Sequence, residues 1–330
     1  MNVAVDAMGG DYAPESVVQG AIEAISGLDI HVTLVGHEKA IRETLGTNRT
    51  PDHISLHHCE GVVGMDESPL KALRKKKDSS ISEALGLLKN GQVDAVISAG
   101  NSGATLAAAV LSLGRINGVE RPGIASILPT ERGPVVLIDV GANVDCRPAH
   151  LLHFGVMADA FSSTCLGTKN PKIGLLSIGE EGTKGNELVR LARELFDKSD
   201  LNFVGNVEGR DIFTGEVDII VCDGFVGNVA LKLSEGVVKM MSRLIENELK
   251  SSILGRSARI LGHKPIGRFK RRLNYEEYGG APLLGVRGIV IICHGGSSVK
   301  AIKNAIRSTA GYVNDRVLEK MRFRLEDYKP

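Results

Sequence analysis

The stretch "VISAGNSGATLA", residues 96–107, decides the fold class. An apolar run ends at Ser98, a corner of glycine, asparagine and serine follows, and small helix-forming residues continue from Gly103. A buried strand, a tight turn and a helix in this order make up the basic unit of α/β folds. The corner between strand and helix is either a plain turn or a place where a ligand binds.

The same order recurs along the whole chain. Several apolar runs are continuous Val, Ile and Leu, which favours parallel strands that are covered on both faces. We predict strands at 3–7, 31–35, 95–99, 125–128, 135–140, 172–178, 219–222 and 289–293. We predict helices at 14–25, 103–113, 148–165, 186–196, 229–249 and 297–312. Because no linker marks a boundary, residues 1–330 are expected to form a single α/β domain with a largely parallel sheet.

Composition limits the class of protein. The chain has 330 residues, of which 43% are hydrophobic and 24% charged, and a net charge of +1, as is typical of globular proteins. No apolar run reaches the ~18 residues of a membrane span, and no signal peptide is visible, so we expect a cytoplasmic protein. Five scattered cysteines without a CxxC pair predict reduced thiols and no metal site. The lack of tryptophan argues against a nucleic-acid partner.

Predicted strands repeatedly end in polar, glycine-rich corners. These corners are residues 8–11, 100–103, 141–143, 179–186, 223–228 and 294–298. The carboxyl ends of parallel strands share one edge, where helix N-termini present free N–H groups that suit an anion. A plain turn remains the alternative for each corner alone, because Gly and Asn are common turn residues. Six such corners, expected on one edge, favour an anion site.

Missing motifs narrow the anion further. Residues 8–11 lack the third glycine of GxGxxG, and GxxxxGK[ST], GxSxG and HExxH are all absent. The sequence therefore argues against a dinucleotide enzyme, a P-loop NTPase and an ordinary serine hydrolase. It favours a small anion such as phosphate, and no cofactor or metal is predicted.

Taken in order, the corners and their flanks resemble the bacterial phosphate acyltransferases. The matching segments, from the first strand to the last helix, are "AVDAMGGDYAP", "ALRKKKDSSI", "SAGNSGATLA", "LIDVGANVDC", "GEEGTKGN", "NVEGRD", "DGFVGNVALK", "YGGAPLLGV" and "HGGSS". The resemblance implies a three-layer α/β/α fold of the kind found in isocitrate-dehydrogenase-like and phosphotransacetylase proteins. It also implies transfer of an acyl group from acyl-acyl-carrier-protein to inorganic phosphate for phospholipid synthesis. A homodimer at the inner face of the cell membrane, which passes acyl-phosphate to a membrane-bound glycerol-3-phosphate acyltransferase, is implied as well.

Such a transfer needs a held phosphate, a stabilised oxyanion and at most a late proton for the leaving thiol. Lys184 is the first candidate for a cation, although it could be a solvated loop lysine. His294 could protonate the thiolate or make a structural hydrogen bond, and Asp11 could orient phosphate or cap a helix. The predicted phosphate-binding residues are Gly9, Gly10, Asn101, Ser102, Gly103, Asn143, Asn228 and Ser297.

Two basic segments are candidates for contacts with partners. Lys71, Arg74 and Lys75 would share one face of a helix and could dock the acidic carrier protein, or could simply be solvated. Residues 229–273 are expected to form a projecting amphipathic helix followed by a basic, apolar segment. Its predicted membrane-facing residues are Leu254, Ile260, Leu261 and Phe269. A protein interface and carrier docking are the alternatives for this segment.

Two other functions remain open at this point. A short-chain phosphotransacetylase acting on acyl-CoA would use similar corners. A non-catalytic scaffold that binds lipid or an anion at the membrane would have purely structural glycine corners.

Overall fold

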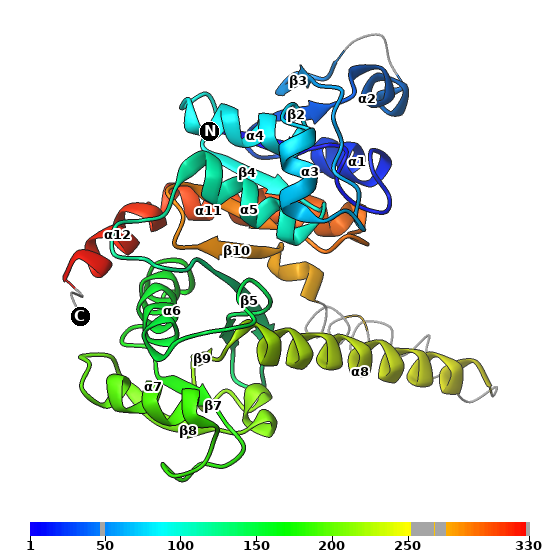
Figure 1. The fold of residues 1–330 in the computed structure, drawn as a ribbon. Coiled ribbons are helices and arrows are strands. Elements are labelled where there is room, and N and C mark those ends of the chain that lie inside the picture. The colour runs from blue at the N-terminus through cyan, green and yellow to red at the C-terminus, as the bar shows by residue number, and fades with distance from the viewer. Residues whose placement is uncertain (47–49, 252–266, 268–274, 328–330) are drawn as a thin grey trace.

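The computed structural model describes residues 1–46, 50–251, 267 and 275–327 (Figure 1). Its strands are β1 (Asn2–Asp6), β2 (His31–Gly36), β3 (Ile54–His58), β4 (Ala95–Ser98), β5 (Gly123–Pro129), β6 (Pro134–Ile138), β7 (Ile173–Leu176), β8 (Phe203–Val207), β9 (Ile219–Val221), β10 (Ala281–Leu284) and β11 (Ile289–Ile292). They form one 11-stranded sheet in the order β3-β2-β1-β4-β11-β10-β5-β6-β9-β7-β8.

The described helices connect these strands. The α-helices are α1 (Glu15–Ile25), α2 (Glu38–Leu45), α3 (Pro69–Lys75), α4 (Ser80–Lys89), α5 (Ser102–Leu113), α6 (Pro148–Phe161), α7 (Glu187–Asp197), α8 (Gly224–Ser251), α11 (Val299–Asn314) and α12 (Val317–Asp327). Short turns of other helix types are η1 (Ser162–Leu166), η2 (Gly209–Phe213) and η3 (Tyr275–Tyr278).

The sheet contains two parallel blocks that run in opposite directions. We call β3, β2, β1, β4 and β11 the first block, and β6, β9, β7 and β8 the second block. Between them, β10 pairs antiparallel with β11 and β5, and β5 pairs antiparallel with β6. Three reversals leave the blocks opposed, so the expectation that all six corners share one edge is wrong.

Helices cover both faces of the sheet and complete three α/β/α layers. One face buries apolar side chains with α1, α6, α11 and α12, represented by Val17, Phe154, Ile302 and Met321. The opposite face does so with α3, α4, α5 and α8. Continuous runs such as "AVIS" in β4 are fully buried because both faces are covered, as the sequence pattern predicts.

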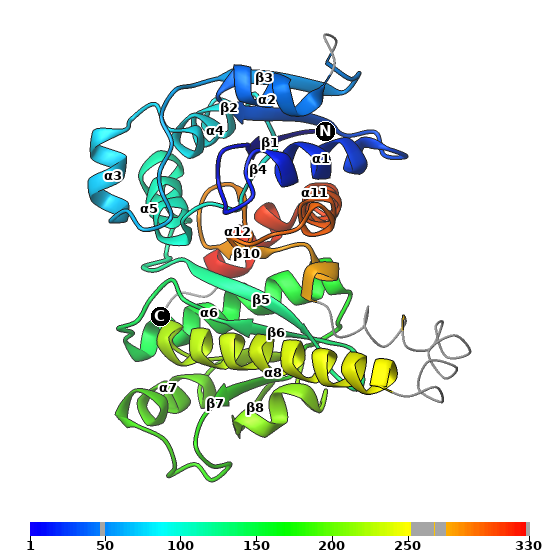
Figure 2. The same ribbon diagram turned by 90° about the vertical axis from the view of Figure 1, so that its right-hand side faces the viewer.

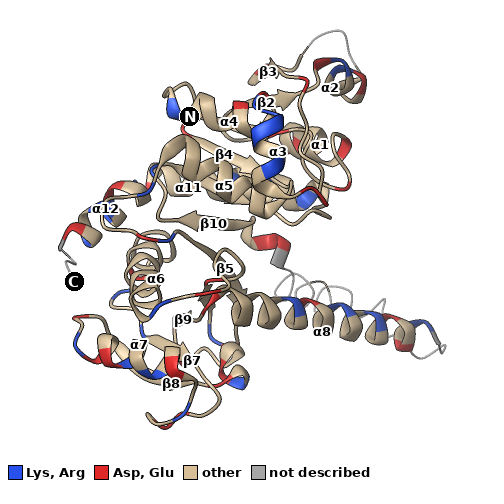
Figure 3. Ribbon diagram, viewed as in Figure 1, with Lys and Arg blue, Asp and Glu red and all other residues tan. Residues whose placement is uncertain are grey.

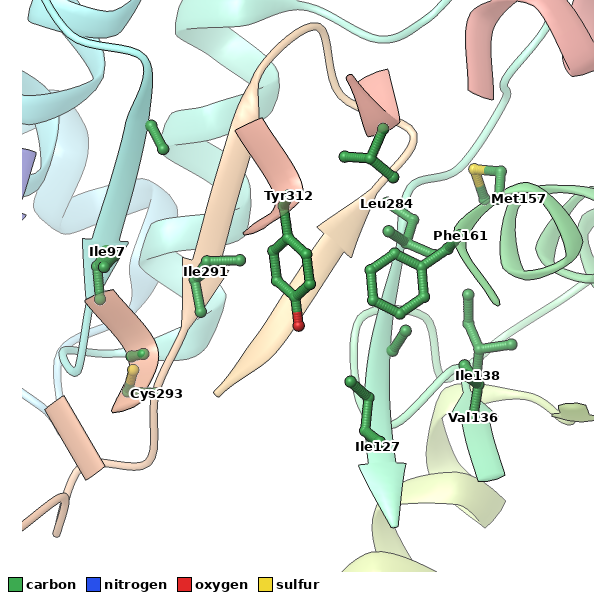
Figure 4. Packing of buried hydrophobic residues seen from close by; sticks show 14 of the residues in the cluster. Ile97, Ile127, Val136, Ile138, Met157, Phe161, Leu284, Ile291, Cys293 and Tyr312 are labelled. Carbon is green, nitrogen blue, oxygen red and sulfur yellow. The ribbon is translucent and has the colours of Figure 1, made fainter. Parts of the chain in front are cut away.

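The two blocks share a core where they meet (Figure 4). Phe161 at the end of α6 and Tyr312 on α11 make an edge-to-face contact with ring centroids 5.3 Å apart. Leu284 on β10 belongs to the same buried cluster. Aromatic pairs of this geometry add roughly 0.5–1.5 kcal/mol beyond their buried area. The contact therefore helps to fix the blocks relative to each other.

Helix α8 crosses the second block and then extends away from the body of the molecule (Figures 1 and 2). It carries exposed apolar side chains at helical spacing, namely Val229, Leu233, Val237, Met240, Met241 and Leu244. None of the helices that the structure describes is long and apolar enough to cross a bilayer. The predicted membrane-facing residues Leu254, Ile260, Leu261 and Phe269 lie outside the described residues.

Candidate active site

The three corners of the first block meet at the carboxyl ends of β1, β4 and β11. The backbone N–H of Asp11 donates to the carbonyl oxygen of Gly295 at 2.8 Å. A Cβ on Gly10 would lie 2.9 Å from that same carbonyl, and a Cβ on Gly9 would lie 2.7 Å from the backbone nitrogen of Gly100. Gly10 also has a φ of +113°, which favours glycine. These glycines serve the close approach of one corner to the next.

A buried carboxylate that the sequence analysis does not single out holds these corners together. Asp6 is 3% exposed and accepts a hydrogen bond from Ser98 Oγ at 2.7 Å and from the backbone N–H of Met8 at 3.2 Å. Ser98 Oγ in turn accepts from the N–H of Gly100. Burial raises the pKa of Asp6, while hydrogen bonds from Ser80 and Ser98 lower it. Asp6 therefore links the corner after β1 to the corner after β4 through hydrogen bonds.

Asn101 caps α5 and ties down a neighbouring loop. Its Oδ1 accepts from the N–H of Ala104 at 3.0 Å, and its Nδ2 donates to the carbonyl oxygens of Met65 and Glu67 at 2.8 and 3.1 Å. Both amide hydrogens are therefore engaged within the protein. The first N–H groups of a helix have no acceptor inside it, so those of Ser102 and Gly103 are the donors that α5 offers to an anion.

We expect Asn101→Ala to lower the free energy of unfolding by about 1–2 kcal/mol, because it removes an N-cap and two loop contacts. Asn101→Ser keeps an oxygen for the cap without placing a carboxylate against the carbonyl oxygens of Met65 and Glu67, and should lose less. Urea unfolding of the three proteins measures the difference. Equal stability of Asn101→Ala and wild type would mean that the cap and the loop contacts contribute nothing.

The corners of the second block are built around another buried carboxylate. Asp139 is fully buried and accepts from the backbone N–H groups of Ile124, Ala142 and Asn143 at 3.0, 3.0 and 2.7 Å. The Asn143 side chain donates to Asp139 at 2.9 Å and to the carbonyl oxygen of Pro122 at 2.7 Å. Burial raises the pKa of Asp139. Asn143, a predicted phosphate ligand, therefore has both side-chain hydrogens engaged away from solvent.

A cleft of about 420 Å³ lies between the corners of the two blocks. The first block contributes Asp11, Ser102, His294 and Ser297 to its wall, and the second block contributes Gly141 and Asn228. Helices α5 and α11 both begin at this cleft. At α11 the N-cap Ser298 donates to Oε1 of Glu276 at 2.9 Å, so the α5 end is the one without a nearby carboxylate at its cap. Five of the predicted site residues are thus brought together although the two blocks run in opposite directions.

Helix α8 adds a cation that the sequence analysis does not name as a site residue. Lys232 lines the cleft, and its Nζ lies 3.0 Å from Oε2 of Glu235, which is 11% exposed. Lys232 is the one lysine or arginine among the described residues of the cleft wall. The sequence feature that could have indicated Lys232 is the segment "DGFVGNVALK", which leads directly from a corner into a helix.

His294 is held as a neutral ring with a defined donor. Its Nδ1 accepts from the backbone N–H of Gly296 at 3.0 Å, so the proton of the neutral ring is on Nε2. Partial burial lowers the pKa of His294, and the charge of Lys232 lowers it further. Near pH 7 the ring therefore offers an N–H donor without a positive charge.

We expect the pH dependence of turnover to change in His294→Asn. Because the folded-state pKa of His294 lies below its ordinary value of about 6.5, the wild-type ring charges only as the pH falls below that value. Protonation places a hydrogen on Nδ1 against the Gly296 N–H and breaks their contact. Wild-type activity should therefore still be retained at pH 6.5 and fall only at a lower pH, where the ring becomes charged.

Comparison of the two pH–rate profiles isolates the ring, because phosphate titrates identically in both assays. The ratio of wild-type to variant activity should fall as the pH is lowered through the pKa of His294. A ratio that stays constant over the whole pH range would remove His294 from this role.

Four predicted site residues, Gly9, Gly10, Gly103 and Lys184, are not among the described residues of the cleft wall. Gly9 and Gly10 pack corners together, and a Cβ on Gly103 would lie 2.9 Å from Cγ of Pro69 at the start of α3. Lys184 is exposed on the corner after β7 and is not among the described residues of the cleft wall. The alternative of Asp11 as a helix cap does not apply, because α1 has Pro14 at its N-cap.

Sequence comparison places the chain in a family. A family model described as "Fatty acid synthesis protein" matches residues 1–320. Phosphate acyltransferase from Nitratidesulfovibrio vulgaris is 51% identical over 323 residues, which is 97% of this chain and 93% of the relative. Phosphate acyltransferase from Pelotomaculum thermopropionicum is 48% identical over 99% of this chain and 95% of its own length. The chain belongs to the phosphate acyltransferase family. It is therefore an enzyme of the acyltransferase class.

Solved structures agree on the fold. A phosphotransacetylase from Streptococcus pyogenes matches with a TM-score of 0.63 and 20% identity, covering 95% of this chain and 94% of that chain. A branched-chain phosphotransacylase from Enterococcus faecalis matches with a TM-score of 0.56 and 16% identity, covering 95% and 99%. At this identity the likeness shows that this phosphate acyltransferase family member shares their fold, as the sequence resemblance implies.

Proposed function

We propose that the chain transfers a long-chain fatty acyl group from acyl-acyl-carrier-protein to inorganic phosphate, giving acyl-phosphate for phosphatidic acid and phospholipid synthesis. The observation that supports this most is the cleft whose wall contains Ser102 at the N-terminus of α5, Lys232 and His294. The α5 N-terminus and a lysine suit a phosphate, and a neutral imidazole N–H suits a carbonyl oxygen. Membership of the phosphate acyltransferase family supports the same reaction.

Phosphate is anionic at neutral pH and needs no general base. We place it against the N–H groups of Ser102 and Gly103, with Lys232 opposite. One phosphate oxygen attacks the thioester carbonyl carbon, and Nε2–H of His294 donates to the oxygen that becomes negative. When the carbonyl re-forms, the C–S bond breaks and the pantetheine sulfur leaves as a thiolate that takes a proton from solvent. A good oxyanion donor contributes roughly 3–4 kcal/mol to such a step.

Phosphate is placed at α5 and not at α8, because a carboxylate already occupies the end of α8. Asp223 Oδ1 accepts from the backbone N–H groups of Phe225 and Val226, both at 3.0 Å. A second anion there would be repelled. At α5 the cap is the uncharged Asn101, which leaves the positive end of the helix uncompensated.

Carrier-protein docking on α3 belongs to the same proposal. Lys71, Arg74 and Lys75 are exposed on this short helix, which shows as a basic element in Figure 3. The loop before α3 contains Met65, which lines the cleft, and Asn101 holds that loop. An acidic carrier protein on α3 would thus present its pantetheine arm next to the cleft.

Further parts of the proposal rest on composition and family membership alone. These are a homodimer, peripheral attachment to the cytoplasmic face of the membrane through residues 253–273, and transfer of acyl-phosphate to a membrane-bound glycerol-3-phosphate acyltransferase. The basic and apolar residues of that segment suit an anionic bilayer surface.

The test is incubation of the purified protein with palmitoyl-acyl-carrier-protein and ³²P-labelled phosphate. We expect loss of the thioester that depends on phosphate, together with labelled palmitoyl-phosphate. Turnover confined to acetyl-CoA would replace the proposal with a short-chain phosphotransacetylase. No turnover with any thioester would favour a scaffold.

A further inference from the structure

A second cavity, which we call the α8 groove, adjoins the cleft. It has a volume of about 710 Å³ and lies between α8, the end of β5 and η2. Leu231 and Glu235 line both the groove and the cleft. The groove therefore lies directly beside the cleft in which the reacting carbonyl would lie. Figure 2 shows α8 lying across the second block, with β5 and β6 beside it.

The walls of the groove present hydrocarbon. Its larger apolar lining residues are Leu128, Pro129, Ile212, Phe213, Leu231, Leu233, Val237 and Val238. Polar side chains in the wall already have partners: Ser234 Oγ donates to the carbonyl oxygen of Ala230 at 2.7 Å, and Thr130 Oγ1 donates to that of Gly133 at 2.8 Å. Glu235 is paired with Lys232. The groove thus suits an apolar ligand better than the amide-rich pantetheine arm.

Several of these side chains are exposed to solvent in the structure. Leu233 is 66% exposed, Val237 is 45% exposed and Phe213 is 39% exposed. Covering such surface is favourable by roughly 25 cal/mol per Å² of apolar area, so an apolar ligand would gain by binding here. The volume falls within the ~300–1,000 Å³ that is usual for small-molecule sites.

We propose that the α8 groove binds the hydrocarbon chain of the acyl donor and thereby sets the preference for long chains. This rests on the proposed function, because the carbonyl must react in the adjoining cleft. A chain that leaves the carbonyl meets Leu231 first and then runs along α8 past Ser234 to Val237 and Val238. The shared lining at Leu231 and Glu235 favours an acyl chain over a second copy of the protein, because an acyl donor that reacts in the cleft must place its hydrocarbon beside the cleft.

The experiment narrows the groove with Val237→Trp and compares palmitoyl- with butyryl-acyl-carrier-protein as acyl donors. We expect kcat/KM for the palmitoyl donor to fall about 10- to 100-fold, since steric loss of even one methylene contact costs about 10-fold or more. The butyryl donor is too short to reach Val237 and should react as with the wild type. Because Val237 is exposed on a helix, the indole should not disturb folding.

Leu191→Trp is the matched control, since Leu191 is 43% exposed on α7 and lies outside the groove. It should leave both donors unchanged. An equal fall for both donors in Val237→Trp, or no fall for either, would overturn the inference. An equal fall together with a smaller particle in light scattering would instead make the groove an interface between copies.

A binding assay separates this inference from the proposed function. The fluorescent fatty acid cis-parinaric acid should bind the wild type, be displaced by palmitate, and bind Val237→Trp more weakly. If the wild type turns over no donor, the proposed function fails, and this assay still decides the groove. If turnover is normal but Val237→Trp binds the probe like the wild type, only the groove assignment fails.

Discussion

Lys232→Ala is expected to lower kcat/KM for phosphate about 100- to 1,000-fold, the usual effect of losing one preorganised donor to developing negative charge. The substitution removes the one lysine or arginine among the described residues of the cleft wall. It also leaves Glu235, a largely buried carboxylate, without its partner 3.0 Å away, so the variant adds repulsion to the loss of attraction. Steady-state kinetics at varied phosphate concentration measure the effect.

Two further variants make this prediction specific. Lys250→Ala removes the same charge from the same helix, about 27 Å further along its axis, and should retain wild-type kinetics. Lys184→Ala compares the lysine that the sequence suggested with the one that the structure places in the cleft wall. If Lys232→Ala folds and has normal kinetics, Lys232 does not bind phosphate, and Lys184 becomes the candidate for the phosphate-binding cation.

Much of the fold can be predicted from the sequence, because buried parallel strands have a continuous apolar pattern. The expected strand at 95–99 is β4 (Ala95–Ser98), and the expected helix at 103–113 is α5 (Ser102–Leu113). The sequence pattern does not predict the strands at the two ends of the sheet or the strand β10 between the two blocks. β3 and β8 lie at the two ends of the strand order and are only partly buried. β10 contains Pro282 and follows two glycines, which disfavour a strand reading.

The direction of the second block could not be predicted, and this limited the prediction of the site. Apolar patterns indicate that a strand is buried but not which way it runs beside its neighbour. The corner at 141–143 was therefore expected beside the corner at 100–103 on a single edge. Gly141 nevertheless lines the cleft. The antiparallel pairing of Ala125 with Ile138 places the end of β6 beside the start of β5, and the start of β5 also lines the cleft.

Residue types at a corner also do not reveal which donors are already engaged. Asn101 and Ser102 are adjacent and similarly polar, yet Asn101 is fully occupied by a cap and a loop, while Ser102 faces the cleft. Lys232 was missed for the opposite reason. A lysine within a helical segment usually faces solvent, and only the crossing of α8 over the second block places this one beside His294.

Gly227→Ala should have the largest effect on stability, with a loss of about 3 kcal/mol or more in the free energy of unfolding. A Cβ at this position would lie 1.9 Å from the carbonyl oxygen of Asp139 and 2.9 Å from Sγ of Cys222. Neither neighbour can yield easily, since Asp139 anchors the second block's corner and Cys222 is buried. The first turn of α8 would have to move away from the sheet.

That movement would also displace Asn228 and Lys232, so catalysis should fall together with stability. Gly236→Ala is the matched control on the same helix, because its Cβ would meet nothing within 4 Å. There the higher helix propensity of alanine should raise the free energy of unfolding by roughly 0.5–1 kcal/mol. Thermal and urea unfolding of both variants measure the contrast. If the two glycines respond alike, the contact between α8 and Asp139 does not position the helix, and the placement of Lys232 in the cleft must have another cause.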